Sequence, residues 1–433
     1  MKKVLIITYY WPPSGGAGVQ RWVKLAKYLV RQGVQPYVIT VHEKQASYLK
    51  LDESLVAEVS PEIKVYKTKS VEPINFYSKL AGKKNVPSAG FSNVDPNSRG
   101  QKIINFIRSH LFIPDPRRGW NRFAFQKAVE LIRSENITHV ITSSPPHSSQ
   151  LIGLRLKQKF KVTWIADLRD PWTDIYYYKL LRHSLFSGYI DSRLEKKVLL
   201  MADKLITVSD QIKRLFAEKD PGIGASKIHV IPNGFDHDDF EGIERKKQRA
   251  FTICYTGTMS SVYQPKVFFQ SLKVVMDRNP DFEIKFQVVG DISEAISKEI
   301  ADTGLAVELV PTVTHDQVVK YQINADLLLL VIPNVENSGG ILTGKLFEYL
   351  ATRNRILGIG PENGDAAKIV KQCKSGQVLG RENTDSIQAF IQQELDNHFI
   401  KGTKVEADWE EIRRYSRERQ AAEIKSLLDE CRT

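Results

Sequence analysis

The feature that most constrains the fold is a series of short, largely apolar runs that alternate with segments of helical spacing. In the first half of the chain these runs lie at 4–8, 36–41, 139–142, 163–166 and 205–208. Short apolar runs without polar alternation are typical of strands covered on both faces, and intervening helices make such strands parallel. The pattern restarts at FTICYTG (251–257) and continues to NRILGIG (354–360). The sequence therefore predicts an α/β protein with two Rossmann-like, doubly wound domains.

The chain has 433 residues, more than a single core usually organises. We expect an N-terminal domain at 1–235, interrupted by a polar, proline-containing insertion at about 70–120. A second domain follows at 236–405, and a closing segment at 406–433 carries an amphipathic helix predicted over 409–430. We expect this helix to cross back onto the first domain.

Charge is distributed unevenly along the chain. Residues 1–200 contain 32 Lys and Arg but only 15 Asp and Glu, whereas the whole chain has a net charge of +12, so the remainder is acidic. A positive first half suits an anionic partner such as a membrane surface. The alternative is a solvated basic face that only aids solubility. No nucleic-acid partner is predicted, because the aromatic residues form no stacking row and no recognised module occurs.

Cysteine usage and hydropathy indicate the compartment. Cys254, Cys373 and Cys431 are few and scattered, which argues against a disulfide framework and against a metal cluster. The apolar N-terminal run is short and is broken by Pro12 and Pro13, so we do not expect a signal peptide or a membrane span. We expect a cytoplasmic protein, with a peripheral position at the inner face of the membrane as a further expectation.

The most informative segment is SGGILTGKLFEYLATRNRILGIGP at 338–361. It places Gly339 and Gly340 in a turn before a helix predicted to start near Thr343, and backbone N–H groups at a helix start suit a diphosphate. Lys345 in the first turn adds a positive charge. Glu348, on about the same helix face, can accept hydrogen bonds from both ribose hydroxyls. The alternative is that Lys345 and Glu348 form an ordinary surface pair.

This segment resembles the C-terminal signature of glycosyltransferase family 4 and related GT-B enzymes, of the type that builds bacterial surface polysaccharides. Further similar motifs follow the same order along the chain: SSPPH at 143–147, ADLRDPW at 166–172, TVSD at 207–210, VIPNGFD at 230–236, YTGTM at 255–259, VVGD at 288–291 and NADLLLL at 324–330. The sequence departs from the family pattern at Gly340, where a first glutamate usually stands eight residues before Glu348.

The resemblance implies two domains facing a cleft and a glycosyltransferase activity. The sugar would pass from a nucleoside-diphosphate sugar to a glycan or lipid-linked acceptor, with retention at the anomeric carbon. Neither a metal nor a cofactor is implied beyond the nucleotide sugar as co-substrate. A nucleotide-sugar epimerase of the same fold and a non-catalytic nucleotide-sugar-binding module are the rival interpretations.

The resemblance also assigns further residues to the donor nucleotide and to the transferred sugar. Those expected at the donor nucleotide are Gly257, Lys266, Gly290 and Val313. Gly15 and Gly16 resemble the loop that approaches the transferred sugar, and the alternative is a plain tight turn.

Four side chains are expected at the carboxyl edge of the first sheet. His147 would hydrogen-bond donor or acceptor oxygens, or serve only the structure. Asp167 would orient or deprotonate the acceptor hydroxyl as a catalytic residue. Arg169 and Asp170 would contact the sugar or acceptor, unless they form an ion pair that braces their loop.

The run at 101–120 has apolar residues at helical spacing with basic residues at its borders, followed by Arg117, Arg118 and Trp120. Such a helix can lie on an anionic bilayer. The competing interpretation is a helix whose apolar face packs on its own domain.

Overall fold

The computed structural model describes residues 1–430 except 49, 73–112, 177, 179–183, 247 and 404. The chain divides into two compact units, the first comprising 1–232 together with 417–433 and the second comprising 233–416. The first boundary lies just before the predicted one, and the chain returns to the first unit at Arg417, later than the predicted 406.

The first unit is built on a seven-stranded parallel sheet in the order β3-β2-β1-β4-β5-β6-β7. Its strands are β1 (Lys2–Ile7), β2 (Val34–Val41), β3 (Lys64–Thr68), β4 (His139–Ser144), β5 (Thr163–Leu168), β6 (Lys204–Thr207) and β7 (Ile228–Val230). Leu5 and Ile7 of β1 point into one buried core. Val4 and Ile6 point into a second core on the other face. This double burial explains why the strands are apolar runs.

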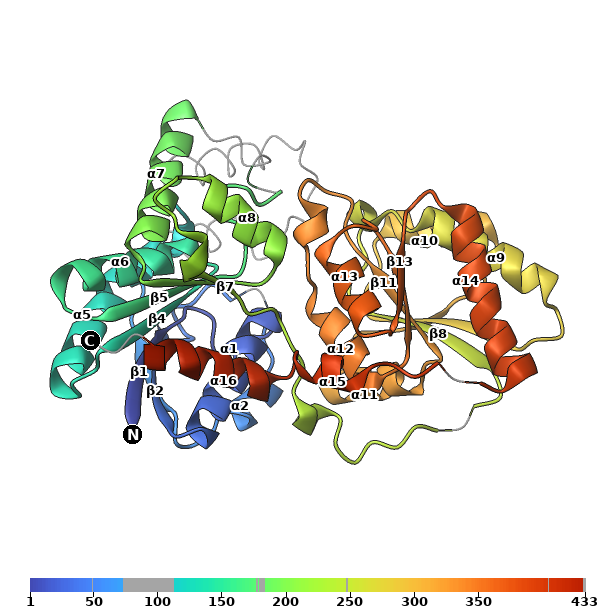
Figure 1. Ribbon diagram of the computed structural model, residues 1–433, viewed down its shortest axis with the longest axis horizontal. Helices are drawn as coiled ribbons and strands as arrows, with labels where there is room; N and C mark the ends of the chain where they lie inside the picture. Colours follow the sequence, from blue (N-terminus) through green and yellow to red (C-terminus); the bar gives the residue numbers. More distant parts are fainter. Residues whose placement is uncertain are drawn as a thin grey trace. The chain divides into compact units, whose positions relative to one another are not determined.

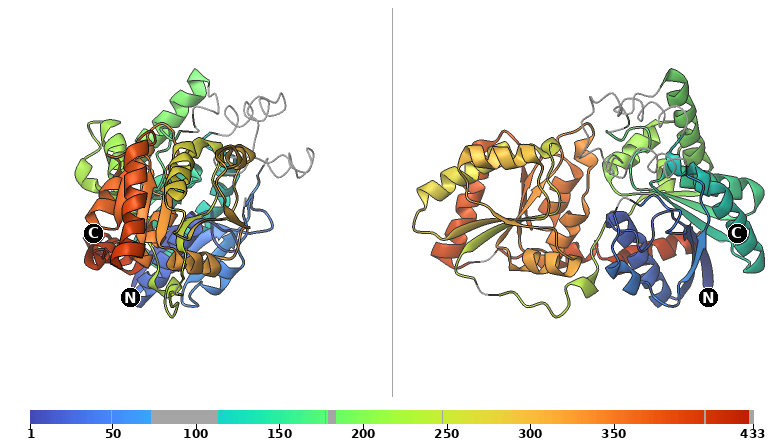
Figure 2. Two further views of the ribbon diagram at one scale, coloured as in Figure 1. Left: turned by 90° about the vertical axis from the view of Figure 1, so that its right-hand side faces the viewer. Right: turned by 180° about the vertical axis from the view of Figure 1, so that it is seen from behind.

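Helices cover both faces of this sheet (Figure 1). They are α1 (Ala17–Arg31), α2 (Ser54–Ala57), α5 (Asn121–Ser134), α6 (Gln150–Lys159), α7 (Leu185–Met201), α8 (Asp210–Glu218) and α16 (Arg417–Glu430). α1 and α16 run side by side over one face, as Figure 2 also shows, and Lys425 donates to the Gln32 carbonyl at 2.9 Å. α5, α6, α7 and α8 pack on the other face.

The second unit has a six-stranded parallel sheet in the order β10-β9-β8-β11-β12-β13. Its strands are β8 (Phe251–Thr256), β9 (Ile284–Val289), β10 (Glu308–Val310), β11 (Leu327–Val331), β12 (Arg355–Ile359) and β13 (Gly376–Leu379). The helices are α9 (Lys266–Arg278), α10 (Glu294–Thr303), α11 (His315–Asn324), α12 (Gly344–Thr352), α13 (Asp365–Gln372), α14 (Thr384–Asp396) and α15 (Trp409–Arg413). α9, α10 and α14 pack on one face, and α11, α12 and α13 on the other.

Each strand order reverses at one point, between β1 and β4 in the first unit and between β8 and β11 in the second. Open α/β sheets bind ligands outside the carboxyl ends of their strands at such a reversal. The predicted site residues are therefore to be sought at these two edges, each within its own unit.

The single closing helix predicted over 409–430 is wrong, because two helices are present, α15 in the second unit and α16 in the first. The Phe235 N–H donates to the Tyr415 carbonyl at 3.1 Å, and a parallel bridge joins Phe235 to Ser416. A carbonyl used in this way is not available to continue the hydrogen bonds of a helix, so the helix breaks here.

Candidate functional site

The turn and helix predicted to bind the diphosphate are present in the second unit. Gly339 and Gly340 end a short 3-10 turn, and α12 begins at Gly344 with Thr343 as its N-cap residue. The Thr343 side chain makes no capping bond, and its buried hydroxyl has no hydrogen-bond partner within the described residues. The first-turn N–H groups of a helix lack intrahelical acceptors, so this end offers several donors to an anion.

Lys345 lies beside these donors. Its ammonium donates to the Tyr255 hydroxyl at 2.7 Å and lies 3.9 Å from the centre of the Tyr255 ring. Burial lowers the pKa of Lys345 to about 7, although the Glu348 carboxylate opposes the shift. Gly257 adopts a φ of 101°, and a Cβ there would lie 3.2 Å from the Lys345 Nζ. A larger residue at 257 would be strained and would crowd the ammonium.

Glu348 is held from two sides. Its Oε1 lies 3.2 Å from His315 Nε2, and its Oε2 accepts a hydrogen bond from Gln322 Nε2 at 2.8 Å. Burial alone would raise the pKa of Glu348, but these two hydrogen bonds keep it below its usual value. The group is therefore an ionised carboxylate, as a ribose-binding role requires, and not an ordinary surface pair with Lys345.

The other predicted donor residues lie at or near the same sheet edge. Gly257 follows β8 and Gly290 follows β9, and a Cβ at Gly290 would lie 2.5 Å from the Gly257 carbonyl oxygen. Val313 lies just before α11 and packs against the core of that face. Lys266 is exposed at the start of α9, and its place at the nucleotide stays a prediction.

In the first unit, the glycine loop after β1 leads directly into α1. Gly16 caps the helix with a φ of 108°. Gly15 donates its N–H to the Lys50 carbonyl at 2.9 Å, so it packs against its own domain. Gly18 was not predicted, yet a Cβ there would collide with the Arg169 guanidinium. The loop is thus a turn, and the start of α1 that follows it lies close against the Arg169 guanidinium.

His147 opens a short 3-10 turn after β4 and lies flat against Trp172, with ring centres 5.0 Å apart and planes 12° apart. Burial and the Arg169 charge lower the pKa of His147 to about 3, so its imidazole is neutral at physiological pH. Neither ring nitrogen has a hydrogen-bond partner within the described residues. The ring can therefore hydrogen-bond a hydroxyl group, as expected, but it is a very weak base.

Arg169 and Asp170 lie beside His147. The Arg169 Nε donates to the Ser144 carbonyl at 3.2 Å, which fixes the guanidinium over the end of β4. Burial raises the pKa of Asp170, and the Arg169 charge opposes the shift. Both residues are described, and no ion pair within 4.0 Å joins them, so the loop is not braced in that way.

Asp167 is not at an open edge, which corrects the expectation of a catalytic carboxylate facing a crevice. Its side chain is fully buried and lies 3.3 Å from the Arg21 guanidinium, itself fully buried. Its other oxygen accepts from Trp22 Nε1 and from the Ser143 hydroxyl, both at 2.8 Å. Because the carboxylate is fully buried among these internal partners, Asp167 cannot reach an acceptor hydroxyl.

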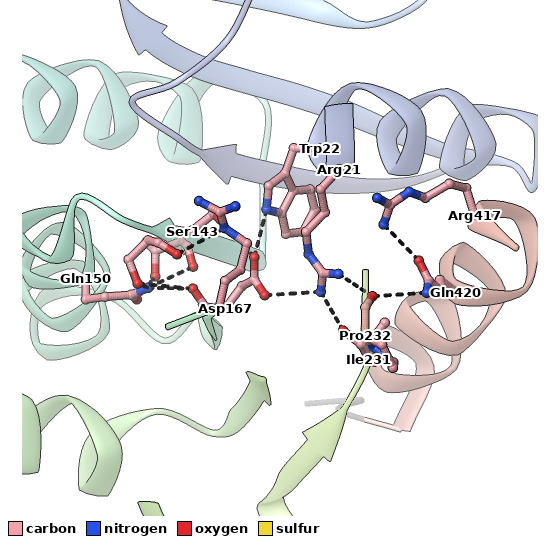
Figure 3. A network of polar contacts seen from close by, with 12 residues as sticks. Arg21, Trp22, Ser143, Gln150, Asp167, Ile231, Pro232, Arg417 and Gln420 are labelled. Carbon is pink, nitrogen blue, oxygen red and sulfur yellow. Dashed lines mark hydrogen bonds and ion pairs between the residues drawn. The ribbon is translucent and has the colours of Figure 1, made fainter. Parts of the chain in front are cut away.

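Arg21 extends this network to the last residues of the first unit, as Figure 3 shows. Its guanidinium donates to the Pro232 carbonyl at 2.6 Å and to the Ile231 carbonyl at 2.9 Å. Gln420 of α16 donates to the same Pro232 carbonyl at 3.0 Å. Asp167 therefore neutralises an arginine that ties α1, β5, α16 and the end of β7 together.

Most of the run at 101–120, predicted as a membrane-surface helix, lies outside the described residues. Its final part is described and contradicts the membrane interpretation for Trp120, which is fully buried and donates to the Thr68 hydroxyl at 2.8 Å. Arg117 is partly buried and lies over the Tyr10 ring. Arg118 is exposed.

The part of the chain that contains His147 and Arg169 is similar to a known protein family. Residues 89–239 match the family model described as Glycosyltransferase Family 4. These residues are similar to glycosyltransferase family 4. The resemblance seen in the short sequence motifs is thereby confirmed for about a third of the chain.

A curated relative supports the family 4 match. The D-inositol 3-phosphate glycosyltransferase of Paenarthrobacter aurescens strain TC1 is 27% identical over an alignment of 135 residues, and the match covers 28% of this chain and 33% of that protein. The chain thus matches about a third of the length of this curated relative.

Solved structures show the fold over the whole chain. The sucrose-phosphate synthase of Thermosynechococcus elongatus superposes with a TM-score of 0.62 at 13% identity and covers 99% of both chains. An α,α-trehalose-phosphate synthase (UDP-forming) from Burkholderia vietnamiensis has the same TM-score at 10% identity, over 99% of this chain and 100% of its own. At such identities the likeness shows the fold alone, which is the predicted GT-B fold with two Rossmann-like domains.

None of the described helices is long and apolar enough to cross a membrane. Within the same residues, no group of three or more His, Cys, Asp or Glu side chains could hold a metal ion.

Sequence reasoning missed several residues of both sites. In the first unit these are Gly18, Arg21 and Trp172, and in the second unit they are His315 and Gln322. One signal was present for the last pair, because a separation of seven residues places both on the same face of a helix, two turns apart. The others contact their partners only through the tertiary fold.

Proposed function

We propose that the protein is a glycosyltransferase that moves a sugar from a nucleoside-diphosphate sugar to a hydroxyl of a glycan or lipid-linked acceptor. The observation that carries this proposal is the grouping of Lys345, Glu348 and the unpartnered Thr343 hydroxyl at the start of α12. A diphosphate requires a cation and N–H donors, and ribose hydroxyls suit a carboxylate. The family 4 match in the first unit supports an acceptor site there.

In the proposed reaction the bond between the anomeric carbon and the diphosphate oxygen breaks, and a bond to the acceptor oxygen forms. Negative charge then grows on the departing diphosphate, where the ammonium of Lys345 and the start of α12 stabilise it. Retention at the anomeric carbon and independence of a metal ion are parts of the proposal that rest on the family resemblance.

The first unit contributes recognition of hydroxyl groups. His147 is neutral, so it can accept or donate a hydrogen bond, but a pKa of about 3 leaves it too weak to take up the acceptor proton. Arg169 supplies a positive charge beside it. Asp167 has only a structural role, because its carboxylate is fully buried and held by Arg21, Trp22 and Ser143.

The first experiment identifies the donor nucleotide by thermal shift with UDP-, GDP-, ADP- and TDP-sugars. The nucleotide that stabilises the wild type is then titrated against Glu348→Ala. Its Kd is expected to rise about tenfold or more, because a hydrogen bond to a charged group contributes about 1.5–3 kcal/mol. Asp302→Ala removes an exposed carboxylate of α10 and serves as the matched control.

A second experiment separates transfer from its rivals. The donor sugar is followed by NMR spectroscopy, which distinguishes epimers of equal mass, with and without a mixture of lipid-linked and soluble glycans. Sugar transfer only in the presence of an acceptor supports the proposal. Conversion of the donor sugar without an acceptor would indicate an epimerase, and tight binding without any turnover would indicate a non-catalytic module.

A further inference from the structure

The carboxylate assigned to the ribose is oriented by one neighbouring helix. His315 is the first residue of α11, and Gln322 follows two turns later on the same face. His315 Nε2 lies 3.2 Å from one Glu348 oxygen, and Gln322 Nε2 lies 2.8 Å from the other. Each oxygen of Glu348 is therefore held by a different nitrogen.

Gln322 is fully buried and anchored to the sheet as well. Its Nε2 also donates to the Thr256 hydroxyl at 3.1 Å, at the end of β8. Because an ionised carboxylate only accepts hydrogen bonds, the amide nitrogen of Gln322 must face Glu348. The Thr256 N–H in turn donates to the Tyr349 hydroxyl at 3.0 Å. The orientation of Glu348 is thus set jointly by α11, β8 and α12.

These contacts leave acceptor capacity on the carboxylate. A carboxylate has about four lone-pair positions, and the two nitrogens of His315 and Gln322 occupy one on each oxygen. Each oxygen can accept one further hydrogen bond. Two adjacent hydroxyls of a ribose provide two such donors, whereas a 2′-deoxyribose provides one.

We propose that His315 and Gln322 are positioning residues that hold Glu348 so that each of its oxygens serves one ribose hydroxyl, which makes the site selective for ribonucleotides over 2′-deoxyribonucleotides. This inference rests on the proposed function, since it concerns the same nucleotide site.

A purely structural explanation is that these bonds only fasten α11 to α12. Substitution of His315 or Gln322 would then lower stability and leave the preference for ribose over 2′-deoxyribose unchanged. The ratio of affinities for a ribonucleotide and its 2′-deoxy counterpart therefore separates positioning from bracing, because the base and the diphosphate are identical in the two ligands.

The experiment measures Kd by isothermal titration calorimetry for UDP, GDP and ADP and for dUDP, dGDP and dADP. The proteins are the full-length wild type, His315→Ala, His315→Gln, Gln322→Met and Gln317→Ala. Gln317 is exposed on α11, so its substitution is the matched control. Thermal unfolding is recorded for every variant. Should the buried Gln322→Met variant fail to fold, the partly buried His315 variants carry the test.

In the wild type and in Gln317→Ala, the 2′-deoxy form of the preferred nucleotide should bind about tenfold or more weakly. The ratio should fall below about threefold in His315→Ala and Gln322→Met, and His315→Gln should restore it because glutamine keeps an N–H donor. Folded variants with the wild-type ratio would overturn the positioning role alone. Equal affinity of the wild type for a nucleotide and its 2′-deoxy counterpart would overturn the proposed selectivity for ribonucleotides. Failure of all six nucleotides to bind would overturn the proposed function and this inference together.

Discussion

Nucleotide binding by the second unit should weaken steeply as the pH rises above 7. Lys345 is the cation at the start of α12, and burial lowers its pKa to about 7. About half of the molecules therefore carry the ammonium form at that pH. A bound diphosphate stabilises this form and raises the pKa again, so binding takes up a proton above pH 7, and the affinity falls as the pH increases.

The size of the effect follows from the fraction of Lys345 that is charged. If the diphosphate binds only the ammonium form, the apparent Kd grows in proportion to 1 + 10^(pH − 7). From pH 6.5 to pH 8.5 the Kd should rise about 25-fold. A solvent-exposed lysine, with its ordinary pKa near 10.4, would give no change over this range.

Calorimetric titration at pH 6.5, 7.5 and 8.5 measures this dependence, in buffers of different ionisation enthalpy so that proton uptake is counted directly. The nucleotide sugar is the better ligand, because its diphosphate has no terminal phosphate that ionises near pH 7. Lys345→Arg keeps a charge at every pH and should give a flat profile, and Lys345→Met should bind weakly at all three. A flat wild-type profile, or an unchanged slope in Lys345→Met, would refute the reasoning.

Three further predictions concern the first unit. Asp167→Asn leaves the guanidinium of Arg21 buried without its anion, so the free energy of unfolding measured with urea should fall by about 3–5 kcal/mol, and a loss below about 1 kcal/mol would contradict the ion pair. His147→Phe keeps a ring against Trp172 and should preserve thermal stability while lowering transfer about tenfold or more; undiminished transfer would remove His147 from the site. The expected membrane contact predicts sedimentation with anionic but not neutral liposomes at low salt, and a protein that stays in the supernatant with both would favour a soluble acceptor.

Local sequence was sufficient to predict the strands and the helix start at α12, which is proposed to bind the diphosphate. The residues FTICYT form β8, and this strand could be predicted because a short, largely apolar run is itself the pattern of a buried strand. Likewise, the turn at Gly339 and Gly340 and the start of α12 fall within eight residues of each other, so one short pattern contains both. Lys345 and Glu348 were placed correctly at one helix start for the same reason.

The hydrogen-bond partners of Asp167 and Glu348 could not be predicted from the local sequence. Arg21 lies 146 residues before Asp167, and His315 lies 33 residues before Glu348. Nothing in the local pattern ADLRDPW distinguishes a carboxylate that meets a ligand from one that neutralises a buried arginine. Burial decides between these uses, and burial is a property of the assembled fold.

The hydrogen bond from Phe235 to Tyr415 shows how the polypeptide is divided between the two units. It brings the first and last residues of the second unit together, so 233–416 is a continuous domain inserted into a discontinuous one. In the first unit, Lys2 of β1 contacts Asp429 of α16, which places the ends of the chain side by side as well. Residues 233–416 are accordingly suited to expression as a separate domain, and a short linker from Asp429 to Lys2 would permit circular permutation of the whole protein.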